Sequence, residues 1–296
     1  MNKPKRDQHF VPKVYLKGFS EDDVFVIMNE VDQKIILSKS VPIDTICFKK
    51  DLYETKNNQG EFVNRNYLEE CLRHLEIQFT YYRERLKKRA YIKDNYKTNC
   101  FFTKDEKTFW RVFITLQMLR SPKVLETAKN FSENYFGESM SKNDAHAMAV
   151  KTCLPFFEEA KPDSQNCFMI LIEPLYSMSI ALGVDYSDQL ITSDNPVYCY
   201  SPNQTIESYS RVVFPLTSDL VIVLSGQDYK NEYGKNRLFE ISDIDRELFI
   251  KSTAYCANRF IYSKKELSKE IENLILEARR DQHIGGAQDE TILQNG

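Results

Sequence analysis

Residues 211–224 read RVVFPLTSDLVIVL, two short apolar runs on either side of Thr-Ser-Asp. β-Branched and aromatic side chains fill both runs and turn-forming residues separate them, which predicts strands over Arg211–Phe214 and Leu220–Leu224. Similar runs bounded by turn-type residues predict further strands at Met178–Val184, Gln189–Thr192, Val197–Tyr200 and Arg259–Tyr262. This half of the chain therefore predicts a mostly antiparallel sheet.

A helical middle precedes these strands. Apolar residues at three- and four-residue steps, from Leu68 to Leu86, predict a helix over 65–89. Asp105 and Glu106 favour the start of a second helix over 105–120, because the first turn carries the positive end of the helix dipole. The remaining predicted helices cover 123–135, 142–160, 242–257 and 264–280.

Before the helices, Val24–Asn29 and Lys34–Ser38 flank Val31-Asp32-Gln33 and predict a hairpin. The order of elements predicts an α+β fold with an N-terminal β-hairpin, a helical middle, later mostly antiparallel strands and C-terminal helices. We expect the hairpin to join the later strands across the helices. The predicted organisation is one domain over 1–284, with a helical insert over about 64–160 as an option, and a disordered polar tail over 285–296.

The composition limits the kinds of protein with which the sequence is consistent. The 296 residues are 42% hydrophobic and 28% charged with a net charge of −3, which is typical of a globular protein and gives no strong field toward nucleic acid. Seven cysteines without a C-x-x-C pair predict free thiols in a reducing cytoplasm. The polar N-terminus and the interrupted apolar stretch Cys167–Val184 predict no membrane span. Motifs for nucleotide loops, metalloproteases and serine hydrolases are absent from the sequence.

Two polar segments outside the helices are candidate sites. His9, beside an apolar run, would act as a general acid or base or contact phosphate; alternatively, it packs and anchors the N-terminus by a hydrogen bond. Thr192-Ser193-Asp194-Asn195-Pro196 follows an apolar strand, and Asp194 would ligate a metal or act as a base. The same five residues also suit an Asx-type turn before a proline.

Two further segments lie on the predicted helices. Glu69 and Glu76 share a helix face, where they would hold a divalent ion or form solvated salt bridges, with Arg73 pairing to Glu69. Gln117 and Arg120 lie among apolar residues. Arg120 would clamp a phosphate or, alternatively, form a buried ion pair or a helix cap.

Six stretches together resemble one known family. In this order they are QHFVPKVYLKGF, LEECLRHLE, FITLQMLRSP, ITSDNPV, FPLTSDLVIVL and NRFIYS. Over roughly residues 7–263 they are similar to the bacterial and phage-associated family named domain of unknown function 4238, for which the resemblance implies no established activity. The polar positions that it marks are Gln8, His9, Glu69, Glu76, Gln117, Arg120, Ser193, Asp194, Asn195 and Pro196. Their coincidence with the polar segments favours one convergent polar site.

The leading hypothesis is a hydrolase that acts on a phosphate-containing substrate, most concretely a nuclease in a bacterial defence or toxin setting. His9 would be the general acid or base, and Arg120 would stabilise phosphoryl charge. Asp194, with Glu69 or Glu76, would bind Mg²⁺ or Mn²⁺ or orient water. The residues expected to position the substrate are Gln8, Gln117, Ser193 and Asn195.

Two alternatives stay open. A non-catalytic nucleotide- or protein-binding module, acting as a sensor or antagonist, would use the same residues as a static pocket. In a purely structural interpretation they form a buried network that fixes the fold. The expected partner is nucleic acid or a nucleotide, and the basic run Arg83–Arg89 would contact its backbone or form a solvated helix face. Neither the substrate nor the oligomeric state follows from the sequence.

Overall fold

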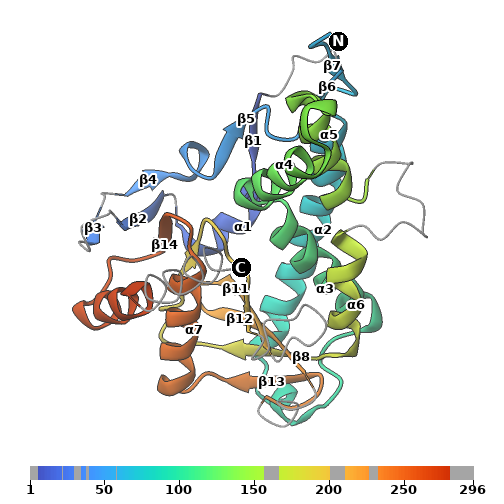
Figure 1. Ribbon diagram of the computed structural model, residues 1–296. Helices are drawn as coiled ribbons and strands as arrows, with labels where there is room; N and C mark the ends of the chain where they lie inside the picture. Colours follow the sequence, from blue (N-terminus) through green and yellow to red (C-terminus); the bar gives the residue numbers. More distant parts are fainter. Residues whose placement is uncertain are drawn as a thin grey trace, which may run out of the picture.

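Figure 1 shows a computed structural model that describes residues 6–21, 23–29, 35–37, 40–57, 59–156, 167–200, 211–226 and 233–280. The strands are β1 (Asp7–His9), β2 (Asp23–Asn29), β3 (Ile35–Leu37), β4 (Val41–Pro42), β5 (Phe48–Lys50), β6 (Thr55–Lys56), β7 (Phe62–Val63), β8 (Ser179–Val184), β9 (Thr192–Ser193), β10 (Tyr198–Tyr200), β11 (Arg211–Thr217), β12 (Leu220–Ser225), β13 (Arg237–Glu240) and β14 (Phe260–Ser263). The helices are α1 (Lys13–Leu16), α2 (Tyr67–Ala90), α3 (Lys104–Leu119), α4 (Pro122–Phe136), α5 (Lys142–Cys153), α6 (Cys167–Ser177) and α7 (Asp243–Cys256). Short 3-10 turns are η1 (Lys17–Phe19), η2 (Ile43–Thr45), η3 (Lys93–Lys97) and η4 (Gly137–Ser139), and residues 269–280 are also helical. This order confirms the predicted α+β class.

The two apolar runs within residues 211–224 form β11 and β12, at the centre of the main sheet. Its strand order is β10-β11-β12-β8-β13, and all neighbours are antiparallel except the parallel pair β13 and β8. Every residue of β12 is buried, as is every residue of β11 after Arg211. A strand covered on both faces needs apolar side chains at every position, which explains why the sequence shows continuous runs and no alternation.

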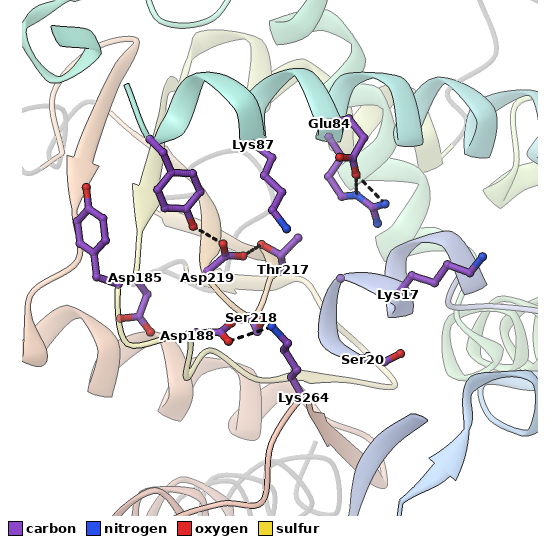
Figure 2. A pocket seen from close by; sticks show the side chains of 14 residues that line it. Lys17, Ser20, Glu84, Lys87, Asp185, Asp188, Thr217, Ser218, Asp219 and Lys264 are labelled. Atoms are coloured by element: carbon purple, nitrogen blue, oxygen red, sulfur yellow. Dashed lines mark hydrogen bonds and ion pairs between the residues drawn. The ribbon is translucent and has the colours of Figure 1, made fainter. Parts of the chain in front are cut away.

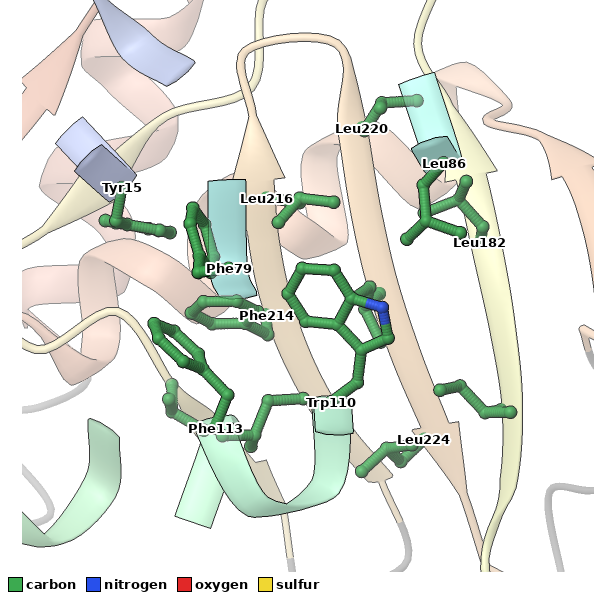
Figure 3. Packing of buried hydrophobic residues seen from close by; sticks show 14 of the residues in the cluster. Tyr15, Phe79, Leu86, Trp110, Phe113, Leu182, Phe214, Leu216, Leu220 and Leu224 are labelled. Atoms are coloured by element: carbon green, nitrogen blue, oxygen red, sulfur yellow. The ribbon is translucent and has the colours of Figure 1, made fainter. Parts of the chain in front are cut away.

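Helices cover the two faces of this sheet. On one face an aromatic cluster from α1, α2 and α3 packs against β8, β11 and β12 (Figure 3). Its Tyr15 ring stacks on Phe214 with centroids 5.2 Å apart, and Phe79 lies 4.6 Å from Phe113. On the other face, α7 contributes Phe249 to a second cluster. Burial of each large aromatic side chain contributes on the order of 2 kcal/mol, so these contacts fix α2 and α3 to the sheet.

The N-terminal strands join the later ones, as expected. β2 pairs antiparallel with β3, and also with β14 from near the other end of the chain, which in turn pairs with β9. The predicted hairpin turn, Val31-Asp32-Gln33, lies outside the described residues, as does the predicted disordered tail over 285–296. The single-domain organisation and the optional helical insert stay predictions.

Several predicted boundaries were wrong. The strand expected over Gln189–Thr192 is reduced to β9, because the preceding backbone folds around the Asp185 carboxylate, which accepts N–H groups from Ser187 and Gln189. The helix expected over 142–160 ends at Cys153, just before Leu154-Pro155, where proline disfavours a helical predecessor. Helix 264–280 begins only at residue 269. The sequence did not predict α6, β13 or the short strands β1, β6 and β7. No helix among the described residues is both long and apolar enough to cross a membrane.

Candidate functional site

The Gln-His pair near the N-terminus is held by the loop after β5. Gln8 is fully buried, and its amide donates to Glu54 Oε1 (2.7 Å) and accepts the Tyr53 backbone N–H (2.7 Å). The His9 ring lies 5.6 Å from that of Phe48, on the strand that pairs with β1. Both ends of the Gln8 amide are therefore used to anchor the N-terminal segment.

Arg120, directly after α3, extends this anchoring to the helices. Its guanidinium donates to the backbone oxygen of His9 and, at 3.4 Å, to Tyr53 Oη, and it lies 3.6 Å from Glu76. Tyr53 Oη donates in turn to the backbone oxygen of Arg120 (3.0 Å). Burial alone would lower the pKa of Arg120, but Tyr53 and Glu76 raise it above its ordinary value, so the group stays charged. Donors committed in this way are not available to a phosphate.

Gln117 adds a contact from the same end of α3. It is 2% exposed, and its Nε2 donates to the backbone oxygen of Phe10 (2.9 Å). We call this set the N-terminal polar network; it comprises Gln8, Tyr53, Glu54, Glu76, Gln117 and Arg120. Its hydrogen bonds run largely to backbone groups of the first ten residues and of the loop after β5, which is the role of a structural anchor.

The two candidate glutamates of α2, Glu69 and Glu76, both act on Tyr53 of this network. Burial raises the pKa of Tyr53, and both Glu69 and Glu76 add to that rise, as expected for carboxylates on one helix face. The predicted ion pair between Arg73 and Glu69 was wrong, because Arg73 pairs with Glu70. Arg73 Nε donates to Glu70 at 3.1 Å, because a residue three positions away is also a neighbour on the helix surface.

Asp194 ties β9 to the turn between α7 and β14. Its carboxylate accepts the backbone N–H groups of Asn258 (2.8 Å) and Arg259 (2.9 Å), and its own N–H donates to the Phe260 oxygen (3.0 Å). Burial raises the pKa of Asp194, although these N–H groups act to lower it. The buried carboxylate therefore serves as an acceptor for backbone donors that have no strand partner.

The neighbours of Asp194 are engaged in the same turn. Ser193 Oγ donates to the Asn195 backbone oxygen (2.8 Å) and accepts its N–H (3.2 Å). Asn195 Nδ2 donates to the Cys256 oxygen (3.0 Å). The segment therefore forms a turn closed by the Ser193 hydroxyl, which takes the place that an aspartate or asparagine side chain would have in the expected Asx-type turn.

The predicted site residues thus divide into two groups. Gln8, Gln117, Arg120 and Glu76 contact the N-terminal segment and its supporting loop, whereas the contacts of Ser193, Asp194 and Asn195 run to one another and to residues 256–260. Among the described residues, no three Asp, Glu, His or Cys side chains gather in a way that would hold a metal ion. Joint action of His9 and Asp194, and a Mg²⁺ or Mn²⁺ ion at Asp194 with Glu69 or Glu76, stay predictions.

A cavity of about 440 Å³ opens between α2, η1 and three connections of the strands (Figure 2). Lys87 comes from α2 and Lys17 from η1. Asp188 comes from the β8–β9 connection, Asp219 from the β11–β12 turn, and Lys264 directly follows β14. Charged side chains from five segments converge on this space, which we call the polar cleft.

The floor of the polar cleft is the β11–β12 turn, clamped by its neighbours. The Ser218 N–H donates to the Gly18 oxygen (3.0 Å), and the Asp185 N–H donates to the Asp219 oxygen (2.8 Å). A Cβ on Gly18 would lie 2.9 Å from the Leu216 oxygen, closer than a side chain tolerates. Glycine is required where two backbones approach this closely.

Among the described carboxylates of the cleft, Asp188 forms the most ion pairs. It accepts from Ser218 Oγ, from Lys264 Nζ (3.0 Å) and from Lys265 Nζ, 2.9 Å away. Burial would raise the pKa of Asp188, but these three donors lower it below its ordinary value. Its φ of 56° lies in the left-handed region, which aspartate tolerates better than most residues.

The other three carboxylates that line the cleft also have partners within the protein. Glu84 lies 3.1 Å from the Arg83 guanidinium. Asp185 is fully buried and lies 2.9 Å from the Arg246 guanidinium. Asp219 accepts from the Tyr91 hydroxyl and from Thr217 Oγ1 (2.5 Å). The negative charges of the cleft are therefore balanced or hydrogen-bonded inside the protein.

Two cations and two aromatic rings at the cleft remain available. Neither Lys17 nor Lys87 makes an ion pair with any described residue, and both are exposed. Figure 2 shows the Lys87 side chain reaching from α2 toward Thr217 and Asp219. Tyr91 and Tyr186, 46% and 59% exposed, lie with their ring centroids 6.2 Å apart. The cleft thus combines uncommitted ammonium groups with exposed aromatic surface.

Comparison with protein families gives a match over residues 7–266 to the family described as protein of unknown function (DUF4238). The chain belongs to the DUF4238 family. The match includes every residue of the N-terminal polar network, of the segment 192–196 and of the polar cleft. Comparison with curated proteins and with solved structures returned no match.

The sequence analysis did not identify most of the residues that line the polar cleft as candidate site residues. The missed residues are Lys17, Asp185, Asp188, Asp219 and Lys264. One available signal is Thr-Ser-Asp, which occurs at 192–194 and again at 217–219, each time at the end of a strand. A second is the basic run Arg83–Arg89, whose Arg83 and Lys87 line the cleft.

Proposed function

We propose that this DUF4238 protein binds a phosphate-containing ligand of the nucleotide type in the polar cleft. The observation that carries the proposal is the pair of lysines, Lys17 and Lys87, which line the cleft and form no ion pair with any described residue. An ammonium group is a compact point charge with three donors, which suits phosphate oxygens.

The electrostatics of the cleft support an anionic ligand. Asp188 is neutralised by Lys264 and Lys265, and Asp185 by Arg246. Since these carboxylates already have cationic partners, they repel an incoming phosphate weakly. Asp219 accepts from hydroxyl groups alone and keeps its negative charge, so Lys17 and Lys87 outnumber the one carboxylate that has no cationic partner among the described residues. The overall charge of −3 argues against a long nucleic acid and favours a small ligand held by a local group of cations.

The tyrosines give a reason for a nucleotide in preference to inorganic phosphate. Bases stack on exposed aromatic rings, and each such contact contributes roughly 1–3 kcal/mol to binding. Tyr91 is held in place by its hydrogen bond to Asp219, and Tyr186 Oη lies 2.8 Å from Tyr96 Oη, so both rings are fixed at their hydroxyl ends. A base beside this pair would place its phosphates toward the lysines.

Binding without turnover is the form of this function that the geometry favours. Arg120 and Asp194, expected as catalytic residues, use their polar atoms on backbone groups, and neither they nor His9 line the polar cleft. Hydrolysis of the bound phosphate ester, including nuclease activity in a defence or toxin setting, remains a prediction for the same experiment. A nucleotide ligand fits a cytoplasmic location, which seven free thiols also favour.

The test is equilibrium binding of radiolabelled ATP, GTP and a short RNA to wild type, Lys17→Met, Lys87→Met and the control Lys88→Met. Lys88 is exposed on the same helix and does not line the cleft. We expect each cleft variant to weaken nucleotide binding about tenfold, equivalent to ~1.4 kcal/mol, and the control to bind as wild type does. Equal affinity of all four proteins, or no binding at millimolar concentration, would overturn the proposal.

The recovered ligand separates the two forms of the function. Chromatography of the ligand after incubation, with and without Mg²⁺ or Mn²⁺, would show either unaltered nucleotide or a cleaved product. An unaltered ligand supports a sensor or binding module. Cleavage that disappears in Asp194→Asn, in a protein that is still folded, would support the hydrolase.

A further inference from the structure

A second cavity, of about 740 Å³, lies away from the polar cleft, between α4, α5 and the turn that joins α7 to β14. Its size falls within the roughly 300–1,000 Å³ of typical small-molecule sites. The apolar part of its wall comes mainly from two helices; it comprises Val124, Ala128, Phe131, Phe136, Met148 and Ala149. Phe131 is 69% exposed and Met148 40% exposed, which is unusual for side chains that large. We call this space the apolar pocket.

One end of the apolar pocket is polar. Asn195, next to Asp194, and Asn258, in the turn between α7 and β14, line it together with Ser121 at the start of α4. Asn195 Nδ2 is fixed by its bond to the Cys256 oxygen, so the amide is held in one orientation. A few fixed polar groups at the end of an apolar cavity are typical of sites that orient a ligand.

Lys123 is the one charged residue among the described residues that line the apolar pocket. It is exposed in the first turn of α4 and makes no ion pair with any described residue. Its charge reaches the pocket, since it acts to lower the pKa of Cys256, which burial raises to about 12. A long apolar wall with a single cation at its rim is complementary to a molecule with an apolar body and one negative charge.

We propose that the apolar pocket binds an amphipathic carboxylate, such as a medium- or long-chain fatty acid. The hydrocarbon body lies against Phe131, Phe136 and Met148, and the carboxylate lies at Lys123. Chain burial would supply most of the affinity, because transfer of apolar surface from water is the dominant favourable term. The ion pair with Lys123 would set the orientation and select an acid over a neutral analogue.

Two thiols in the same wall give an internal reporter of occupancy. Cys153 and Cys167 both line the apolar pocket, Cys153 fully buried and Cys167 half-buried. The neighbouring Cys153 thiol lowers the pKa of Cys167 below its ordinary value, so we expect alkylating reagents to modify Cys167 near neutral pH. A ligand in the pocket would cover this sulfur. Cys100 is exposed and does not line the pocket, so it serves as the control thiol.

The experiment measures binding of dodecanoate and of the neutral 1-dodecanol by calorimetry to wild type, Lys123→Met and Lys142→Met. Lys142 is exposed on α5 and does not line the apolar pocket. We expect Lys123→Met to weaken dodecanoate binding roughly two- to fivefold, as for one exposed ion pair, and to leave dodecanol unchanged. Lys142→Met should match wild type with both compounds.

A second variant and a second readout keep the outcomes distinct. Ala128→Phe fills the pocket, so we expect it to lose both compounds while its unfolding transition stays cooperative. Dodecanoate should slow alkylation of Cys167 by N-ethylmaleimide and leave Cys100 unaffected. No binding of dodecanoate at 25 °C, no protection of Cys167, or equal affinity of wild type and Lys123→Met would overturn the proposal. Capture of a peptide segment that Ala128→Phe abolishes, with no uptake of either small molecule, would also overturn it.

Discussion

The N-terminal polar network and the polar cleft contain the same kinds of side chain in opposite states. In the network, Arg120 and Gln8 direct their polar atoms at backbone groups and at buried partners. In the cleft, the carboxylates are satisfied, but Lys17 and Lys87 are not paired within the described part of the chain. Residue type alone would give both regions the same role.

The two regions differ in whether the charged side chains already have hydrogen-bond or ion-pair partners within the protein. A buried guanidinium with several protein acceptors stabilises the fold, and removing it strands those acceptors. An exposed ammonium at a cavity costs little to leave unpaired, and it gains free energy only when an anion binds. The network should therefore respond to mutation in stability, and the cleft lysines in affinity.

The largest expected effect is on the network. Arg120→Met should lower the free energy of unfolding by about 3 kcal/mol, because it strands Glu76 and the oxygens of His9 and Tyr53 that the guanidinium contacts. Urea unfolding followed by circular dichroism measures this change. Lys87→Met should stay within ~0.5 kcal/mol of wild type, as an exposed position does. Equal stability losses in the two variants would remove the distinction between the regions.

Asp194 should behave like the network and unlike the cleft lysines. Asp194→Ala leaves the N–H groups of Asn258 and Arg259 without their acceptor and should cost about 2 kcal/mol. Asp194→Asn keeps one acceptor oxygen and should cost less. Thermal unfolding of the three proteins gives the order. A fully stable Asp194→Ala that nevertheless loses a nucleotide-dependent activity would contradict the structural role and place Asp194 in a site.

The sequence predicted much of the fold, because helix and strand periodicity is local. α2, α3, α4 and α7 start and end within a few residues of the expected ranges, and β2 pairs with the later strand β14, in line with the expectation that the hairpin joins the later strands. α6 was missed because its apolar residues surround the helix and show no period. β13 was missed because its four residues, Arg237–Glu240, carry too little pattern for a parallel edge strand.

The candidate site was less predictable. Whether a polar side chain already has a partner within the protein depends on residues far apart in the chain. Gln8 meets Glu54 across 46 residues, and Arg120 meets His9 across 111. Sequence spacing identified these polar residues as special and left their roles open. For the cleft, no single stretch carries the site, because Lys17, Lys87 and Lys264 come from three distant segments.

A third prediction concerns the contact that joins the scaffold to the cleft. Gly18→Ala would press a methyl group to 2.9 Å from Leu216 O and from Thr217 Cγ2, so η1 must move off the β11–β12 turn. We expect a loss of roughly 1–2 kcal/mol in stability together with weaker nucleotide binding. Its neighbour Lys17→Ala should weaken binding alone. Unfolding and binding measured on both variants would show whether the glycine effect is packing; identical behaviour of the two would contradict this.

The smallest expected effect tests whether the cleft carboxylates are already committed. Ser218, Lys264 and Lys265 hold the pKa of Asp188 below its ordinary value, although burial opposes them. A carboxyl with a lowered folded-state pKa contributes stability that is complete above its unfolded pKa of about 3.9. That contribution disappears as the pH falls through the lower folded pKa. Asn also tolerates the left-handed backbone at this position, so Asp188→Asn removes the charge with little added strain.

Asp188→Asn should therefore be less stable than wild type by about 0.5–1 kcal/mol at pH 7, the range of a partly exposed ion pair. The difference should shrink as the pH falls below about 4, because other carboxyl groups titrate alike in both proteins. Urea unfolding at pH 7 and at pH 3 measures it. A difference that stays constant with pH would mean that the Asp188 charge is not what the lysines stabilise. Lys264 would then be available to bind an anionic ligand, as Lys17 and Lys87 are. The cleft would hold three such cations, whereas Arg120 of the network is bound to partners within the protein.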